Sequence, residues 1–472
     1  MVSEQEMIVV IETGSSSVSG AAGYKRPDGT LEVVAYASEP SGEFIKNGVV
    51  RNIDRTAQCL TNIINMLEGA MKNVTIDKVY VGLGGYTLHS IHSKVERGFD
   101  EETRVTAEMV ESMFSDNEER IVSDKTVIEV IPQEYHVDSL VTSEPVGYNC
   151  RHIVGEYLNL MARFSTMDNL VAALDMAKLE KTDTLVTPVR LAEAILTPTE
   201  RSLGCTLVDI GAGSTTVSVY KGGQLRFLSV VPLGDSLITS DLITLGIGDD
   251  EAERIKRTIG LTPADSSEST YRAESGSEIS RKDIGLAIRA RMQEILANAA
   301  NQVKQSGYTD DKLSSGYIFT GGALDIPGAR KYISGYSDFA RVRFAEVGAN
   351  ISWKASECPS SAKQIALTAL IAAGDENCVT ITREVPKEID YTDPNLEQGT
   401  LFTDEGEDAQ TERDRQEAER KKADKEKKRA EAEEEKRRQK EAQKAARPKR
   451  KSLIIRIKEM RDNLTDLIND ND

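Results

Sequence analysis

Residues 8–18, IVVIETGSSSV, decide the fold. In this stretch an apolar run is followed by an acidic residue, a glycine and three serines. The apolar run predicts a strand, and Gly14 predicts a sharp turn after it. Consecutive backbone N–H groups in such a turn form a concavity that binds anions, and glycine allows a ligand to approach closely. We therefore interpret this stretch as a phosphate-binding turn. Its predicted nucleotide contacts are Glu12, Gly14, Ser15, Ser16 and Ser17.

A second stretch of the same kind is CTLVDIGAGSTTVSVYKGG, residues 205–223. A single turn rich in glycine and serine is often only a hairpin. Two copies in one chain indicate a fold with two similar halves and a ligand between them. Glu12 and Asp209 would then face each other, where carboxylates can hold a hydrated Mg²⁺ through its waters. Asp209 is also a candidate catalytic residue. The other predicted nucleotide contacts of this turn are Gly211, Gly213, Ser214 and Thr215.

Two later stretches complete the predicted nucleotide site. In EAERIKRTIG, residues 251–260, Glu253 and Lys256 share one face of a helix, where they could bond ribose and adenine. A surface ion pair is the more common meaning of that spacing. GYIFTGGALDIPG, residues 316–328, predicts a strand that ends in a glycine turn, and a base or ribose could lie against its bare backbone. The predicted contacts in this turn are Gly321, Gly322 and Ala323.

Composition limits the class of protein. The 472 residues predict two or three domain-sized units. Because no apolar run reaches the length of a membrane span and the start has no signal-peptide pattern, we expect a soluble, non-secreted chain. Five scattered cysteines without CxxC spacing fit reduced cytosolic thiols. The net charge is −18, although residues 412–451 hold 18 Lys and Arg against 11 Asp and Glu. We expect no nucleic-acid partner for this acidic body and an anionic partner for the basic tail.

The C-terminal region changes character twice. Residues 386–411 are acidic and rich in turn formers, and residues 412–446 are almost entirely Glu, Lys, Arg, Ala and Gln without an apolar seam. Both segments are predicted to be linkers. Residues 447–472 combine basic residues with an amphipathic helix pattern, which is typical of a helix in a membrane interface. A helix that docks on the body or on a partner protein is the alternative. The predicted membrane contacts are Lys449, Arg450, Lys451, Leu453, Ile454, Ile457, Met460, Leu464, Leu467 and Ile468.

The three glycine turns, in this order, resemble the actin-like ATPase superfamily. The helix sequence AERIKRTIG resembles the adenosine-binding helix of the heat-shock chaperone branch of that superfamily. Within it, the chain resembles the bacterial cell-division FtsA family over most of residues 7–385 and 447–468. The stretches that carry this resemblance, besides the basic amphipathic terminus, are GEFIKNGVVRNID (42–54), VIEVIPQEYHVDS (127–139), EPVGYN (144–149) and GDSLITSDLITLGI (234–247).

The resemblance implies an α/β, actin-like two-lobed ATPase fold. Its duplicated core is ribonuclease-H-like, and it carries an inserted subdomain of the FtsA type. Residues 1–205 would form the first half, with the insert at about 86–165. Residues 206–385 would form the second half, with a small lobe at about 240–315. The charged linker, 386–446, and the amphipathic helix, 447–472, would follow.

The resemblance also implies a function. Members of the family bind ATP with Mg²⁺, form actin-like filaments with themselves, and attach filaments of FtsZ to the membrane. The C-terminal peptide of FtsZ would dock on the small lobe. The chain would be a peripheral protein on the cytoplasmic face of the inner membrane at the division site, where it recruits other, later division proteins. A small-molecule kinase of the same superfold and a pilus-assembly adaptor are the alternatives, and the basic terminus counts against both.

Three positions depart from the pattern of the family. Ser17 stands where the family commonly has a lysine, and Thr216 where it more often has Asp. The stretch TPVRLAEAIL, residues 187–196, places Thr187 where many relatives carry a Glu that positions or deprotonates the attacking water. Because threonine cannot act as a general base near neutral pH, Thr187 is a doubtful catalytic residue, and we expect ATP binding with slow hydrolysis. A one-residue shift of the alignment would bring Glu193 into question instead.

Overall fold

The structure is a computed structural model that describes residues 6–119, 124–261 and 270–381. These residues fall within one compact unit, Met1–Glu384. The predictions for the linkers and for the membrane helix concern residues 386–472, which lie outside the described residues. Within the described ranges, no helix has the length and apolar character needed to cross a membrane.

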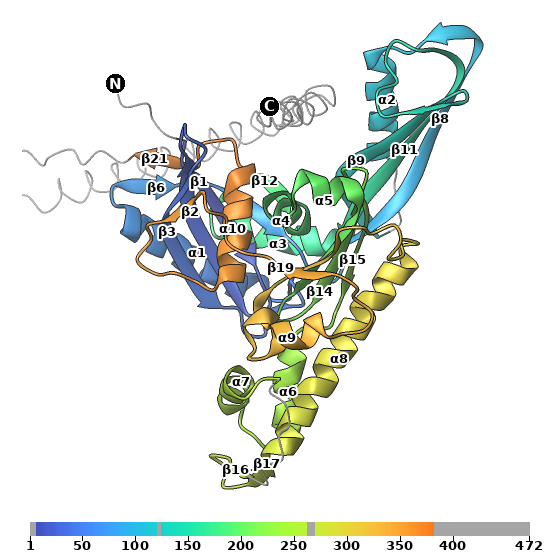
Figure 1. Cartoon of the computed structure of the whole chain (residues 1–472). Coiled ribbons are helices and arrows are strands. Elements are labelled where there is room, and N and C mark those ends of the chain that lie inside the picture. The colour runs from blue at the N-terminus through green and yellow to red at the C-terminus, as the bar shows by residue number, and fades with distance from the viewer. Residues whose placement is uncertain (1–5, 120–123, 262–269, 382–472) are drawn as a thin grey trace, which may run out of the picture. The chain divides into compact units, whose positions relative to one another are not determined.

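A six-stranded sheet forms the centre of the first half. Its strands are β1 (Ile8–Thr13), β2 (Ser17–Lys25), β3 (Leu31–Pro40), β7 (Lys78–Leu83), β12 (Glu180–Val186) and β20 (Ile351–Trp353). They lie in the order β12-β7-β1-β2-β3-β20, and Figure 1 labels β1, β2, β3 and β12 of this sheet. The hairpin predicted from residues 8–18 is the antiparallel pair β1–β2, and β7 and β12 run parallel to β1.

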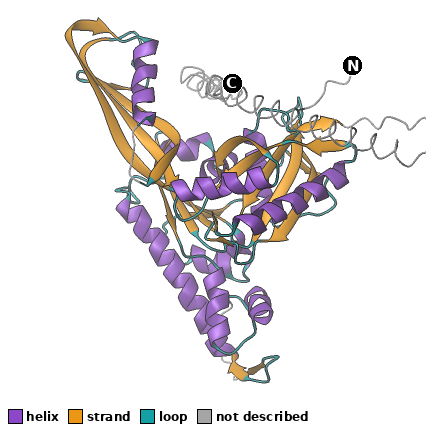
Figure 2. Ribbon diagram, turned by 180° about the vertical axis from the view of Figure 1, so that it is seen from behind, coloured by secondary structure: helices purple, strands orange, loops and turns teal. Residues whose placement is uncertain are grey.

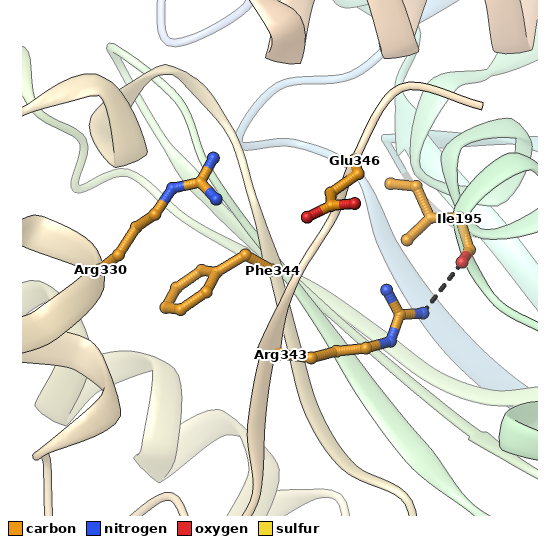
Figure 3. Close-up of a pocket in the computed structure, with 5 residues that line it drawn as sticks. All are labelled: Ile195, Arg330, Arg343, Phe344 and Glu346. Atoms are coloured by element: carbon orange, nitrogen blue, oxygen red, sulfur yellow. Dashed lines mark hydrogen bonds between the residues drawn. The ribbon is translucent and has the colours of Figure 1, made fainter. Parts of the chain in front are cut away.

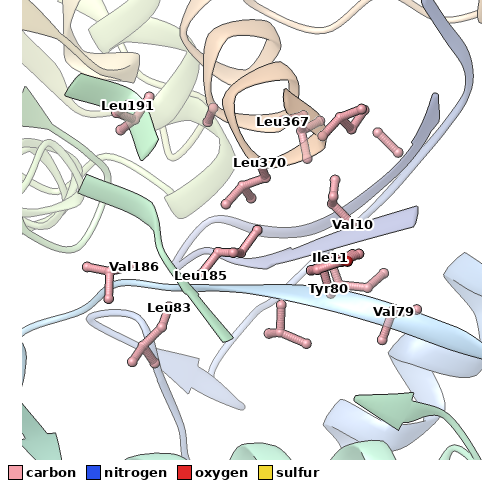
Figure 4. Packing of buried hydrophobic residues seen from close by; sticks show 14 of the residues in the cluster. Val10, Ile11, Val79, Tyr80, Leu83, Leu185, Val186, Leu191, Leu367 and Leu370 are labelled. Atoms are coloured by element: carbon pink, nitrogen blue, oxygen red, sulfur yellow. The ribbon is translucent and has the colours of Figure 1, made fainter. Parts of the chain in front are cut away.

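Four helices pack on this sheet. They are α1 (Ile53–Met71), α3 (Phe164–Met176), α4 (Thr187–Ile195) and α10 (Ser361–Ala373). The helix α1 begins where the side chain of Asn52 accepts a hydrogen bond from the N–H of Arg55, as an N-cap does. Helix α1 packs against α3, and α10 packs against α4, β1 and β2. Figure 4 shows Leu367 and Leu370 of α10 above Ile11 of β1, inside one buried apolar cluster.

The second half repeats the topology of the first. Its strands are β13 (Cys205–Ile210), β14 (Thr215–Lys221), β15 (Gln224–Val231), β18 (Gly316–Thr320) and β19 (Val342–Phe344). The order β15-β14-β13-β18-β19 matches β3-β2-β1-β7-β12, with the same antiparallel hairpin and the same parallel strands on its other side. The predicted duplication of an actin-like core is therefore confirmed.

An inserted subdomain extends the second sheet. It consists of β8 (His89–Arg104), α2 (Ala107–Glu118), β9 (Lys125–Val137), β10 (Leu140–Thr142) and β11 (Asn149–Arg163). These strands continue the sheet of the second half as β10-β9-β11-β8-β15, so the whole sheet has nine strands. Figure 1 shows β8, β9 and β11 extending away from the rest of the protein. The join is short, because His89 pairs with Ser229 and the hydroxyl of Ser90 bonds both the carbonyl and the N–H of Leu228.

The IPQEY stretch, residues 131–135, strengthens this join. Arg226 of β15 donates to the side chains of Gln133 (3.1 Å) and Glu134 (2.9 Å). The amide of Gln133 donates in turn to the carbonyl oxygen of Leu225 at 3.1 Å. The structure therefore gives this stretch, which carried much of the family resemblance, a role in holding the insert to the second half.

A helical lobe follows the hairpin of the second half. It contains α6 (Ser236–Thr244), α7 (Asp249–Thr258), β16 (Thr270–Arg272), β17 (Glu278–Ser280) and α8 (Arg281–Gln305). Helix α6 packs against both α7 and α8, and the β16–β17 pair lies at the far end of the lobe (Figures 1 and 2). The remaining short elements are β4 (Ile45–Lys46), β5 (Val49–Val50), β6 (Val74–Ile76), α5 (Pro198–Leu203), η1 (Gly322–Asp325), α9 (Ala329–Ser334) and β21 (Val379–Ile381).

Candidate nucleotide site

The two predicted phosphate turns have the same geometry. In the first, the N–H of Gly14 donates to the carbonyl oxygen of Ser17 at 3.0 Å. In the second, the N–H of Gly211 donates to the carbonyl oxygen of Ser214 at 2.9 Å. The acidic residue stands two positions before the glycine in both, as Glu12 and as Asp209. The two turns are therefore equivalent parts of the duplicated core.

The fold brings these two turns into contact. A Cβ atom on Gly213 would lie 2.7 Å from the Cβ of Ser15, which is closer than real side chains approach. The hydroxyl of Ser15 accepts a hydrogen bond from the N–H of Gly48 at 2.9 Å, so a third loop supports the first turn. Only glycine fits at position 213, because the backbone of the second turn packs there against the side chain of Ser15 in the first turn.

Several backbone N–H groups of these turns are open to a ligand. Among the described residues, the N–H groups of Ser15, Ser16, Ala212 and Gly213 donate no backbone hydrogen bond. Unpaired N–H groups of consecutive turn residues are the donors that bind phosphate oxygens in such concavities. The turns therefore fit an anionic ligand, although their acidic residues require a compensating cation.

The acidic residues are electrostatically coupled. Burial and, to a smaller extent, the negative charge of Glu12 raise the pKa of Asp209, the ammonium of Lys363 opposes them, and the resulting pKa is about 6. Asp209 is still ionised at neutral pH, since that pH lies above its pKa. Two carboxylates that act on each other electrostatically in a partly buried site attract a divalent cation, and Mg²⁺ binds carboxylates directly or through its waters.

Lys363 is a site residue that the sequence did not reveal. It belongs to the first turn of α10, and its ammonium lies 2.9 Å from a carboxylate oxygen of Glu12. The same nitrogen would lie 3.7 Å from a Cβ on Gly14. Nothing in residues 361–373 distinguishes this lysine from a surface lysine, since its partner lies 351 positions earlier in the chain.

The glycine turn at 321–322 lies directly beside Asp209. Gly321 has φ +103°, a conformation that side chains disfavour, and a Cβ there would lie 2.6 Å from the Oδ1 of Asp209. The carbonyl oxygen of Gly322 accepts a hydrogen bond from Arg257 of α7 at 3.0 Å, and η1 begins at Gly322 and includes Ala323. The third predicted turn is therefore in contact with the residues that lead into the second turn.

The predicted pair on α7 is only partly available to a ligand. Glu253 and Lys256 form an ion pair at 2.7 Å, as the helical spacing suggested. The side chain of Lys256 is only 1% exposed, and it also pairs with Asp235 at 3.4 Å. Glu253 keeps an exposed side chain, although Arg257 and Thr239 also bond it. A contact between this pair and adenosine remains a prediction.

Asp235 was missed as a residue that supports the site. Its N–H donates to the carbonyl oxygen of Gly211 at 3.0 Å, and the next N–H, of Ser236, donates to the carbonyl oxygen of Ala212 at 2.9 Å. The loop before α6 therefore holds the second turn in place. The glycine–acid pair at 234–235, which follows β15, was the available signal.

Thr187 and Glu193 lie on the same helix in different surroundings. Thr187 begins α4 at the end of β12, and its hydroxyl is buried without a partner among the described residues. That hydroxyl would lie 2.8 Å from a Cβ on Gly82. Glu193 pairs with Arg190 at 2.9 Å, and Arg190 also pairs with Glu129 of the insert at 2.7 Å. Glu193 thus belongs to an ion-pair network that links α4 to the insert.

A separate hollow lies near the end of β19 (Figure 3). It is lined by Ile195, Arg330, Arg343, Phe344 and Glu346. Arg343 donates to the carbonyl oxygen of Ile195 at 2.9 Å, and the guanidinium of Arg330 lies over the ring of Phe344. None of the predicted nucleotide contacts lines this hollow.

The duplicated core with two matching hairpin turns is that of the actin-like ATPase fold. Among solved structures, one titled "PilM-PilN type IV pilus biogenesis complex" matches with a TM-score of 0.54 and 16% identity, covering 77% of this chain and 97% of that chain. At this identity the likeness concerns the fold alone.

Sequence comparisons identify the family within the actin-like class of proteins. A family model described as "Cell division protein FtsA" matches residues 206–366, and one described as "SHS2 domain inserted in FTSA" matches residues 85–160. The cell division protein FtsA of Porphyromonas gingivalis is 31% identical over 350 residues, which cover 72% of this chain and 73% of that relative. The cell division protein FtsA of Neisseria meningitidis is 27% identical over 70% of this chain and 81% of its own length. This chain belongs to the FtsA family of cell-division proteins, as the resemblance predicted.

Proposed function

We propose that this chain is an ATP-binding, actin-like adaptor of cell division. It polymerises, binds the C-terminal peptide of FtsZ, attaches FtsZ filaments to the cytoplasmic face of the inner membrane, and recruits other division proteins. The observation that carries the proposal is the contact between the two equivalent turns, around Glu12 and Asp209, in a chain of the FtsA family. A site built from both halves links the bound nucleotide to the relative position of the halves.

The donors around the turns support a nucleotide with Mg²⁺. The open N–H groups of Ser15, Ser16 and Gly213 would bind phosphate oxygens. Glu12 and Asp209 would hold hydrated Mg²⁺, which supplies positive charge that offsets the repulsion between carboxylates and phosphates. Gly321, which has no Cβ, lets the third turn pack directly against Asp209.

Slow hydrolysis is part of the proposal. Thr187 has a buried hydroxyl without a described partner, so it could bond a water molecule or a phosphate oxygen. A hydroxyl of ordinary acidity does not remove a proton near neutral pH. Glu193, the alternative base, is already paired with Arg190. In this account ATP acts mainly as a ligand that favours the filament-forming conformation.

Membrane attachment would follow from the basic amphipathic segment, residues 447–472. One such helix binds a membrane weakly and reversibly, whereas a filament presents many copies at once. Nucleotide binding, assembly and membrane attachment are therefore coupled in this proposal.

Sedimentation with vesicles tests the proposed function. We expect the full chain to sediment with vesicles of phosphatidylethanolamine and phosphatidylglycerol, and to do so more completely with ATP than without it. Deletion of residues 447–472 is expected to leave the protein in the supernatant while its affinity for ATP stays unchanged. Sedimentation of the truncated chain to the same extent as the full chain would contradict the membrane role of this segment. Equal sedimentation of the full chain with and without ATP would contradict the coupling.

A further inference from the structure

The first phosphate turn receives a cation from the other end of the described chain. The Nζ of Lys363 lies 2.9 Å from the Oε2 of Glu12 and beside Gly14, the glycine that opens the turn. The side chain of Lys363 is only 19% exposed, and that of Glu12 is 20% exposed. This ammonium is therefore held at the turn and is partly shielded from solvent.

Helix α10 itself does not stabilise a lysine at position 363. The side chain of Ser360 caps α10, and it accepts the N–H of Lys363 itself. A positive charge in the first turn of a helix is unfavourable, because that end carries the positive end of the helix dipole. The first turn of α10 holds no acidic residue to compensate. The ammonium is stabilised instead by Glu12, a residue of the site.

Lys363 has hydrogen-bonding capacity left for a ligand. An ammonium carries three donors, and within the described residues Glu12 is the acceptor that it bonds. The neighbouring N–H groups of Ser15 and Ser16 are open as well. An anion bound by these N–H groups would therefore lie close to the ammonium of Lys363, which Glu12 already holds in position.

We propose that Lys363 binds the phosphates of the nucleotide and takes the role of the lysine that is missing at position 17. This inference rests on the proposed binding of ATP. The positive charge that contacts the phosphates would then come from α10. Because α10 packs against α4 as well as against β1 and β2, the same lysine would connect the bound phosphates to the helix that begins at Thr187.

The test is the affinity for ATP of the full chain and of Lys363→Met, measured by titration calorimetry. A hydrogen bond to a charged group is worth enough that we expect the variant to bind ATP about tenfold to a hundredfold more weakly. Lys363→Arg keeps the charge and is expected to retain most of the affinity. Lys354→Met removes an exposed lysine nearby in the chain and is expected to bind ATP like the unchanged protein.

A second comparison separates contact with phosphate from simple neutralisation of Glu12. Glu12→Gln and the double variant Glu12→Gln/Lys363→Met are compared in EDTA, where Glu12 has no metal to hold. We expect the double variant to bind ATP about tenfold or more below Glu12→Gln. This comparison also tests the contact between Lys363 and phosphate if Lys363→Met alone is destabilised by an unpaired Glu12.

The failures of the two proposals are distinguishable. If the unchanged chain does not bind ATP, the proposed function is wrong. If the unchanged chain binds ATP and Lys363→Met binds it within twofold, the role of Lys363 is wrong while the proposed function stands. Equal affinities of Glu12→Gln and the double variant would also overturn the role of Lys363, because the lysine would then act only through Glu12.

Discussion

Replacing Gly321 by alanine is expected to abolish ATP binding and to lower the free energy of unfolding by about 3 kcal/mol. Gly321 has φ +103°, which an L side chain adopts only with strain. The added Cβ would lie 2.6 Å from the Oδ1 of Asp209 and would also collide with the carbonyl oxygen of Ile210. Relief of that contact must move either the second phosphate turn or the glycine turn. Denaturant unfolding measures the stability, and calorimetry measures ATP binding.

Gly322 provides the matched control for this substitution. Within the part of the chain that the structure describes, no atom other than those of its chain neighbours lies within 4 Å of the position that a Cβ on Gly322 would take, and its φ is not positive. Gly322→Ala is therefore expected to change the free energy of unfolding by less than about 1 kcal/mol, so it is a control for stability alone. If the two alanine variants had the same free energy of unfolding, the close approach of Gly321 to Asp209 would not be a feature of the protein.

Lys256→Met is expected to lower the free energy of unfolding by about 3 kcal/mol, even without nucleotide. Lys256 is 1% exposed and lies 3.4 Å from Asp235, whose side chain is 3% exposed. Burial raises the pKa of Asp235, and the positive charges of Lys256 and Arg257 oppose that effect. Removal of Lys256 leaves a buried carboxylate with one cationic partner fewer, and that carboxylate belongs to the loop that supports the second turn.

Arg254 of the same helix is the control. It also pairs with a carboxylate, that of Glu274, but both side chains are exposed. Arg254→Met is therefore expected to leave the unfolding curve nearly unchanged, because exposed ion pairs contribute little to stability. The double variant Asp235→Asn/Lys256→Met should recover part of the lost stability, since it removes the buried carboxylate charge that Arg257 alone compensates. Equal effects of Lys256→Met and Arg254→Met would show that Lys256 is not buried with Asp235.

The strand–turn–strand units could be predicted because their signal is local. In residues 8–18 and 205–223, the apolar runs, the acids and the glycines lie within one hairpin, so sequence order and spatial order coincide. Their duplication then predicted the two similar halves. The glycine pair at 84–85, which follows β7 much as 321–322 follows β18, was an available signal that we did not use.

The partners of these local units could not be predicted in the same way. Lys363 reaches Glu12 only because α10 packs on β1, which is a property of the tertiary fold. The spacing of Glu253 and Lys256 says that they share a helix face, but it does not say whether another segment covers that face. The loop at Asp235 does cover it, so Lys256 is buried. Long-range packing therefore decided which predicted residues remain free for a ligand.

The most direct test of the central claim is a calorimetric titration of the full chain with ATP and Mg²⁺ at neutral pH. The claim is that the two equivalent turns together form one nucleotide site. The account predicts saturable binding of one ATP per chain. Absence of binding, or saturation at two ATP molecules per chain, would contradict a single site shared by the two turns.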